Sequence, residues 1–169
     1  MKPSRHVAAA LAVLAIGVGA YLTFQTGGRR EPAPDITYTL LDGSTSGTTQ
    51  LRGKVVLMNF WATTCSVCLH EMPQIVATHE KYRGRGFETV AVAMSYDPPA
   101  SVIRYAELRR LPFGVAIDNT GVIARRFGDV NATPTTVLID KRGVIVERYT
   151  GEPDFAALQR LIDKLLAEA

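Results

Sequence analysis

The most constraining feature of this 169-residue sequence is a pair of cysteines that follows an apolar run and opens a helix. Val55 to Trp61 is rich in branched and aromatic residues, which predicts a strand, and Cys65-Ser-Val-Cys68 follows after a short polar turn. At the first turn of a helix, unpaired backbone N–H groups and the positive end of the helix dipole stabilise a thiolate. We therefore predict that Cys65 is a nucleophile.

Two further side chains share the helical face of Cys65. Cys68 lies three residues on, where it can form a disulfide with Cys65 and lie one turn deeper. It is the predicted resolving thiol. Glu71 lies another three residues along, and we predict that its carboxylate accepts the proton of Cys68 when a mixed disulfide is resolved. The alternative for Glu71 is an ordinary solvated residue on a helix surface.

Three short motifs carry a resemblance to a known family: Asn59-Phe60-Trp61-Ala62, Cys65-Ser66-Val67-Cys68 and Glu71-Met72-Pro73. From about Asp35 to the C-terminus the chain resembles the thioredoxin superfamily, and specifically its TlpA/ResA-like membrane-tethered thiol-disulfide oxidoreductases. Thr64 stands where the family commonly has Trp, and no Pro precedes Cys68. Because residues around the cysteines tune thiolate stability, these departures affect the expected redox potential rather than the reaction type.

The resemblance implies a fold and a second half of the site. The expected fold is α/β, a thioredoxin-like three-layer sandwich with a central mixed sheet, preceded by an N-terminal transmembrane or signal helix. By resemblance, the Thr133–Pro134 bond is cis and Pro134 packs against the cysteine pair. The backbone of Thr133 is then expected to bind an extended, cysteine-bearing substrate segment. Trp61 is expected to shield the disulfide and to pack in the core.

The resemblance also implies partners. Cysteine-containing protein substrates exchange disulfides with the cysteine pair, and a membrane electron donor of the thiol-reducing type reduces it again. The expected direction is reduction, in cytochrome c maturation or in the reduction of copper-site thiols. Spacing alone leaves the direction open, because a pair with a potential near about −120 mV would donate disulfides instead.

The remaining elements follow from hydrophobic periodicity and turn residues. Alternating strands and helices predict right-handed crossovers and a parallel component to the sheet, and a final pair of strands predicts an antiparallel hairpin that turns at Gly143. Residues 44–50 are expected to be a small-polar loop before a short return strand. The strands are expected at 36–40, 55–61, 89–94, 115–118, 135–139 and 144–149, and the helices at 66–83, 100–108, 122–127 and 155–166.

The N-terminal region predicts export from the cytoplasm. A basic start is followed by an uncharged apolar run from Val7 to Phe24. Residues 1–25 are therefore expected to be a signal anchor or a cleaved signal peptide, residues 26–34 a linker, and residues 35–169 one domain. An anchor would span the inner membrane once and hold the domain in the periplasm. A cleaved signal peptide would leave the domain soluble in the periplasm.

Composition excludes several classes of function. The net charge of +3 is scattered and not interleaved with aromatic residues, so we expect no nucleic-acid binding. No cofactor or metal is expected: Leu69 occupies the place after the second cysteine where a c-type haem site requires histidine. His70 and His79 do not make a zinc site with the cysteines, since they lie nine residues apart on one helix.

Two other functions use the same cysteines. A copper chaperone or metal-binding module would need a third soft or imidazole ligand, for which the sequence offers only His70 nearby. A thiol peroxidase would need the Pro-x-x-x-Thr-x-x-Cys context, but Met58 and Ala62 occupy the Pro and Thr places before Cys65.

Overall fold

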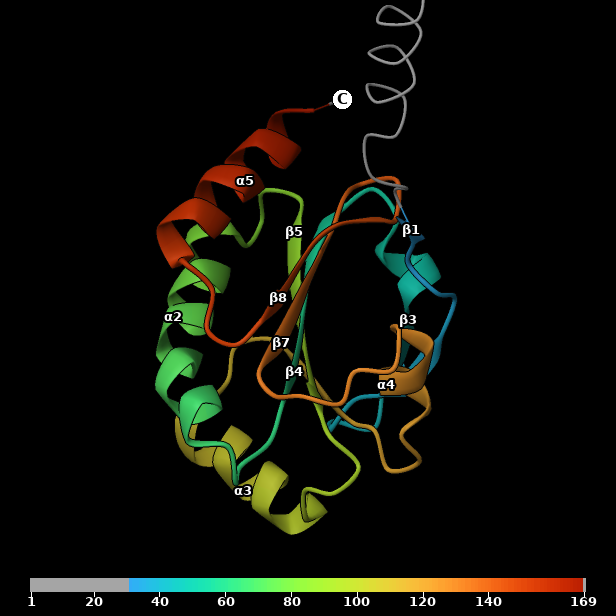
Figure 1. The fold of residues 1–169 in the computed structure, drawn as a ribbon, viewed down its shortest axis with the longest axis vertical. Coiled ribbons are helices and arrows are strands. Elements are labelled where there is room, and N and C mark those ends of the chain that lie inside the picture. The colour runs from blue at the N-terminus through green and yellow to red at the C-terminus, as the bar shows by residue number, and fades with distance from the viewer. Residues whose placement is uncertain (1–30, 169) are drawn as a thin grey trace, which may run out of the picture. The chain divides into compact units, whose positions relative to one another are not determined.

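The fold, shown by a computed structural model that describes residues 31–168, is built on a six-stranded mixed sheet (Figure 1). The strand order is β1-β8-β7-β4-β5-β6, in which β4, β5 and β6 are parallel and β1, β8 and β7 pair antiparallel with their neighbours. The strands are β1 (Glu31–Pro32), β4 (Val55–Trp61), β5 (Phe87–Ala93), β6 (Gly114–Ile117), β7 (Thr135–Ile139) and β8 (Val144–Thr150). A separate hairpin joins β2 (Thr37–Thr39) to β3 (Thr45–Gly47).

The burial of the central strand β4 shows that the sheet is covered on both faces. All seven residues of β4 are buried, as expected for a strand with layers on each side. Successive side chains point to opposite faces. Val55, Leu57 and Trp61 accordingly belong to one apolar cluster, and the alternate side chains of β4 belong to the other.

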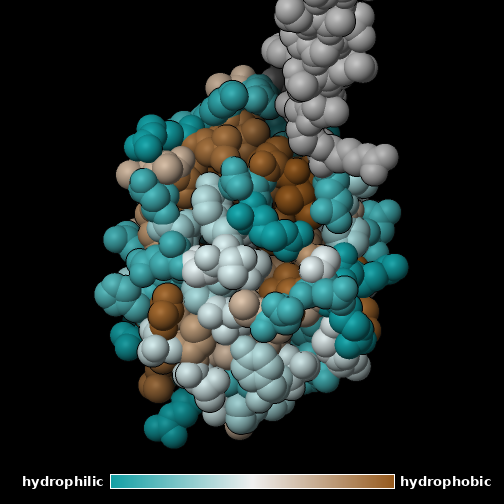
Figure 2. All heavy atoms as spheres, viewed as in Figure 1, coloured by the Kyte–Doolittle hydropathy of each residue, from teal (hydrophilic) through white to brown (hydrophobic). Residues whose placement is uncertain are grey.

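The helices divide between the two faces (Figure 1). Helices α2 (Ser66–Tyr82), α3 (Pro99–Arg109) and α5 (Phe155–Ala167) pack on the face of Trp61. Helix α4 (Val122–Arg126), the 3-10 helix η1 (Thr48–Leu51) and the β2–β3 hairpin cover the other face. In the view of Figure 2, hydrophilic side chains cover much of the surface, and apolar side chains gather in its upper part.

The predicted α/β fold with a central mixed sheet is confirmed, as are the β7–β8 hairpin and the parallel component of the sheet, which β4, β5 and β6 form. Residues 44–50 differ from the expected loop, because Thr45–Gly47 already pair with β2 and η1 follows in place of a return strand. Strand β1 lies within the residues assigned to the linker, where Glu31 and Pro32 pair with Ile145 and Val144 of β8.

The predicted anchor or signal segment over residues 1–25 lies outside the described residues. Among residues 31–168, no helix has the combination of length and apolar character needed to cross a bilayer.

Candidate active site

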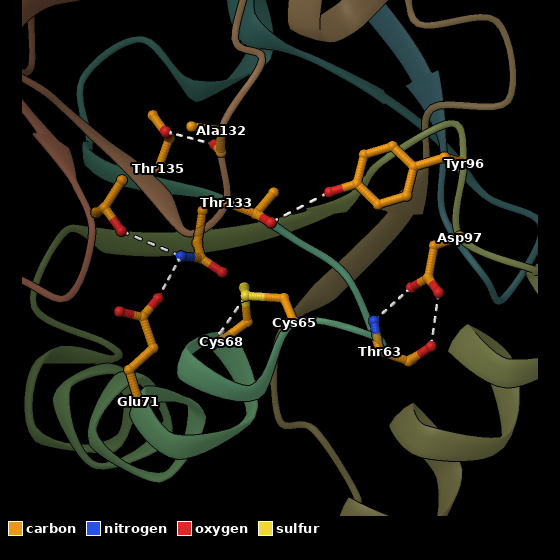
Figure 3. The surroundings of a disulfide bond; sticks show 11 residues. Thr63, Cys65, Cys68, Glu71, Tyr96, Asp97, Ala132, Thr133 and Thr135 are labelled. Atoms are coloured by element: carbon orange, nitrogen blue, oxygen red, sulfur yellow. Dashed lines mark hydrogen bonds between the residues drawn. A yellow bond between two sulfur atoms is a disulfide. The ribbon is translucent and has the colours of Figure 1, made fainter.

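The two cysteines form a disulfide at the N-terminus of α2 (Figure 3). The sulfur atoms are 2.14 Å apart, and Cys65 is the N-cap residue, whose Sγ accepts a hydrogen bond from the Cys68 N–H at 3.1 Å. Cys65 is half-buried, whereas Cys68 is fully buried. The structure thus has the predicted arrangement of one accessible outer sulfur and one deeper sulfur, with a backbone N–H directed at the outer one.

Glu71 lies in a buried polar cluster, three residues after Cys68 on α2. Its side chain has no exposed surface, and its Oε1 accepts a hydrogen bond from Asn59 Nδ2 at 3.0 Å. The same amide group donates to Thr136 Oγ1 at 3.0 Å, so residues from α2, β4 and β7 meet here. Glu71 is therefore not the solvated helix residue that the sequence left as an alternative.

The surroundings of Glu71 favour a carboxyl group that titrates near neutral pH. Burial raises the pKa of Glu71 from 4.5 to about 7, against the opposing effect of the Asn59 hydrogen bond. Within residues 31–168, Glu71 Oε2 and Asn59 Oδ1 are buried without a hydrogen-bond partner. A carboxyl group in this state can hold or release a proton close to physiological pH.

The loop before β7 supplies the opposite side of the site. The Thr133–Pro134 peptide bond is cis, as the resemblance predicted, and Pro134 is buried. Thr133 is half-buried and lies across from the disulfide (Figure 3). Thr135 Oγ1 donates to the Ala132 carbonyl at 2.8 Å, which closes the loop on itself.

Trp61 lies in the core beneath the site. It has no exposed surface, belongs to the same apolar cluster as Cys68, and packs against Tyr105 with ring centroids 5.2 Å apart. Its complete burial supports the packing part of its expected role and leaves no surface for direct contact with a substrate.

The two histidines of residues 31–168 lie nine residues apart on α2. His79 is buried in the core, where its Nδ1 lies 3.2 Å from Thr89 Oγ1, and His70 is exposed on α2. Over residues 31–168, no group of three or more His, Cys, Asp or Glu side chains is arranged to hold a metal ion. Among residues 31–168, the cysteine pair is therefore not joined by a His, Asp or Glu side chain in a metal-binding group.

The segment after β5 also reaches the site, although no role was predicted for it. Asp97 accepts hydrogen bonds from the Thr63 backbone N–H and hydroxyl group, both at 2.6 Å. The Tyr96 hydroxyl lies 3.1 Å from Thr133 Oγ1 (Figure 3). The one available signal was the predicted parallel component of the sheet, because residues that follow neighbouring parallel strands meet at one edge of the sheet; the sequence did not say which strands are neighbours.

A mixed sheet that places a Cys-x-x-C disulfide at a helix N-terminus, opposite a cis proline, defines the class of thioredoxin-like proteins. Comparisons with known proteins agree with this class. The family model described as Redoxin matches residues 29–162. The thiol-disulfide oxidoreductase ResA of Geobacillus thermodenitrificans is 34% identical over 128 residues, which cover 73% of each chain.

Two more relatives extend the comparison. The thioredoxin-like protein YneN of Bacillus subtilis is 28% identical over 128 residues, covering 71% of this chain and 75% of YneN. A crystal structure of a thiol:disulfide interchange protein of the thioredoxin family from Chlorobium tepidum superposes with a TM-score of 0.76 at 26% identity. The match covers 84% of this chain and all (100%) of that one. This chain belongs to the Redoxin family and is a ResA-like thiol-disulfide oxidoreductase.

Proposed function

We propose that this protein reduces disulfides of extracytoplasmic proteins and is itself reduced by a thiol-reducing electron donor in the membrane. The observation that carries the proposal is the difference in solvent exposure between the two sulfurs. Cys65 is accessible, whereas Cys68 and Glu71 are fully buried. An accessible thiolate can attack a substrate, and a shielded thiol beside a base can then release it.

The reaction proceeds in two exchanges. The Cys65 thiolate attacks a substrate disulfide, which forms a mixed disulfide and expels one substrate thiolate. Glu71 takes the proton of Cys68, and the Cys68 thiolate attacks the Cys65 sulfur. This step expels the second substrate thiolate and leaves the Cys65–Cys68 disulfide seen in the structure. Two electrons pass to the substrate, and the Glu71 proton can return to the departing thiolate.

The surroundings of the disulfide support a protein substrate. Val67 and Tyr96 expose 44% and 58% of their surfaces near the disulfide, which gives the rim an apolar character. The backbone N–H and C=O of Thr133 have no backbone partner among residues 31–168, so an extended segment could pair with them as an added strand. The family resemblance suggests apocytochrome c or copper-site cysteines as substrates.

The proposed location is the periplasmic side of the inner membrane. A single span within residues 1–25 would hold the domain there, and a soluble periplasmic form after signal cleavage is the alternative. Either arrangement places the cysteine pair in an oxidising compartment, where a reductant needs electrons delivered through the membrane.

Trapping in the native envelope tests the roles of the two sulfurs. Cys68→Ala is expected to accumulate mixed disulfides through Cys65, because attack survives while resolution fails. Identifying the trapped proteins by mass spectrometry names the substrates. Cys65→Ala, the matched control, is expected to trap none; mixed disulfides formed through Cys68 in that variant would invert the assignment.

A glutathione titration tests the direction. A reductant is expected to have a potential well below that of the strong oxidants, in the region of about −270 mV known for thioredoxin. A potential near about −120 mV would make the protein a donor of disulfides and contradict the proposal.

A further inference from the structure

Asp97 stands out because it is buried beside the site and takes no part in the chemistry proposed above. Only 2% of its surface is exposed, although it lies in the turn between β5 and α3. Both carboxyl oxygens are used by one residue: Oδ2 accepts from the Thr63 backbone N–H and Oδ1 from the Thr63 hydroxyl, each at 2.6 Å (Figure 3). Asp97 therefore holds Thr63 at two points.

The turn that carries Asp97 is itself fixed to the sheet. The Asp97 N–H donates to the Met94 carbonyl at 3.0 Å, and the Met94 N–H donates to the Trp61 carbonyl at 3.0 Å. These bonds tie the end of β5 to the end of β4. The carboxyl group of Asp97 is thus presented to Thr63 from a rigid base.

Thr63 matters because it belongs to the turn that delivers Cys65 to the helix. The Cys65 N–H donates to the Ala62 carbonyl at 3.2 Å, and Cys65 then occupies the N-cap position, where its sulfur accepts the Cys68 N–H. Hydrogen bonds to a cysteine sulfur stabilise its thiolate and so stabilise the reduced protein relative to the disulfide.

We propose that Asp97 is a positioning residue for the thiol-disulfide reaction. By binding Thr63 through both carboxyl oxygens, it fixes the turn that keeps Cys65 at the N-cap of α2, where the Cys68 N–H stabilises the Cys65 thiolate. The inference needs only the disulfide chemistry of the family and holds whichever way the electrons flow.

A second buried aspartate provides a matched control. Asp118 follows β6, the neighbouring parallel strand, and also has 2% of its surface exposed. It accepts two hydrogen bonds, from the N–H groups of Ile123 at 3.1 Å and Ala124 at 2.8 Å. These partners belong to α4 rather than to the cysteine turn. Loss of Asp118 should therefore cost stability without reaching the sulfurs.

The test compares Asp97→Ala, Asp97→Asn and Asp118→Ala in the full chain. The readouts are the equilibrium constant with glutathione and the alkylation rate of Cys65 in the reduced, folded protein. Asp97→Ala is expected to favour the disulfide about tenfold more than the wild type, a shift of about 30 mV to more negative potential, and to slow alkylation similarly. Asp118→Ala is expected to lower Tm without a change in potential.

Asp97→Asn separates hydrogen bonding from charge. The amide oxygen can accept the Thr63 N–H, and the amide N–H can donate to the Thr63 hydroxyl oxygen, so the turn keeps both anchors. The equilibrium constant of this variant with glutathione is expected to lie within about threefold of the wild-type value. An Asn variant that deviates as far as the Ala variant would overturn the proposal, since charge rather than positioning would then be responsible.

Two other results also test whether Asp97 is a positioning residue. If Asp97→Ala lowers Tm as Asp118→Ala does but keeps the wild-type potential, Asp97 is only a structural residue and the proposal is wrong. If Asp97→Ala does not fold, Thr63→Val replaces it, because this change removes the hydroxyl bond and keeps the N–H bond. It is expected to shift the equilibrium constant about threefold, and no shift would refute the proposal. All these shifts are measured relative to the wild type. An oxidising potential of the wild-type protein would therefore contradict the proposed function but not the role of Asp97.

Discussion

Two buried carboxyl groups flank the disulfide, and their surroundings differ. Asp97 has both oxygens engaged by Thr63 in hydrogen bonds of 2.6 Å. Glu71 has one oxygen bonded to Asn59 at 3.0 Å, while the other has no partner within residues 31–168. Both side chains are almost wholly removed from solvent, with exposed fractions of 2% and 0%.

The difference indicates what each group can do. A carboxyl group with every oxygen hydrogen-bonded is committed to holding a structure, because any change in its bonding costs stability. A carboxyl group that has lost water without full compensation has a raised pKa, and burial raises the pKa of Glu71 to about 7, where a proton can be exchanged near neutral pH. The bonding of Asp97, in the turn after β5, thus suits a positioning role, and the bonding of Glu71, on α2, suits proton exchange.

The largest effect that follows from this comparison is on the rate of resolution. We predict that Glu71→Gln slows the decay of a mixed disulfide on Cys65 about 100-fold near pH 7, because Gln can accept the Asn59 hydrogen bond but cannot take the Cys68 proton. Rapid chemical quench with a model protein disulfide measures the decay. Glu80→Gln is the control, since Glu80 lies exposed on the same helix and pairs with Arg83. Equal rates for wild type and Glu71→Gln from about pH 6 to about pH 9 would remove the proton role.

The second prediction concerns the pH dependence of stability in the oxidised protein. The folded-state pKa of Glu71 is raised from 4.5 to about 7. Its contribution to the free energy of unfolding is therefore fully present below pH 4.5 and is lost as the pH rises through 7. Gln does not titrate. The advantage of Glu71→Gln in free energy of unfolding should therefore grow from near zero in acid to roughly 3 kcal/mol above neutral pH. Urea unfolding at several pH values measures this difference, and a difference independent of pH would show that Glu71 titrates normally.

Local patterns were enough to predict the elements that carry the cysteines. The strand over Val55–Trp61, the helix from Ser66 and the β7–β8 hairpin each have a strong periodicity or turn signal within a few residues. Strand β1 has no such signal, because two residues cannot show a period and their hydrogen bonds come from distant β8. The β3 strand was missed for the same reason, since its pairing with β2 and not its composition defines it.

In the site, too, local spacing could be predicted, whereas contacts between distant segments could not. Cys65, Cys68 and Glu71 share one helical face, so spacing alone brought them together. The burial of Glu71 could not be read from that spacing, because Asn59 and Thr136 reach it from two separate strands. The contacts of Asp97 were likewise out of reach, as they depend on the pairing of β4 with β5.

The smallest predicted effect tests whether the segment that holds Thr63 also supports the opposite loop. Tyr96, the neighbour of Asp97, is exposed, and its hydroxyl lies 3.1 Å from Thr133 Oγ1. We predict that Tyr96→Phe raises KM for a protein disulfide about two- to fivefold with little change in kcat, since one exposed hydrogen bond contributes about 0.5–1 kcal/mol. Steady-state kinetics with a protein substrate measures both constants.

A double-mutant cycle with Thr133→Val identifies the origin of that effect. If the hydroxyl of Tyr96 acts by holding Thr133, each single variant already breaks the bond, and the double variant should be no worse than either one. Losses that add would mean that Tyr96 and Thr133 meet the substrate independently. In that case Asp97 alone would connect the segment after β5 to the site, and the positioning role would be confined to the cysteine side of the disulfide.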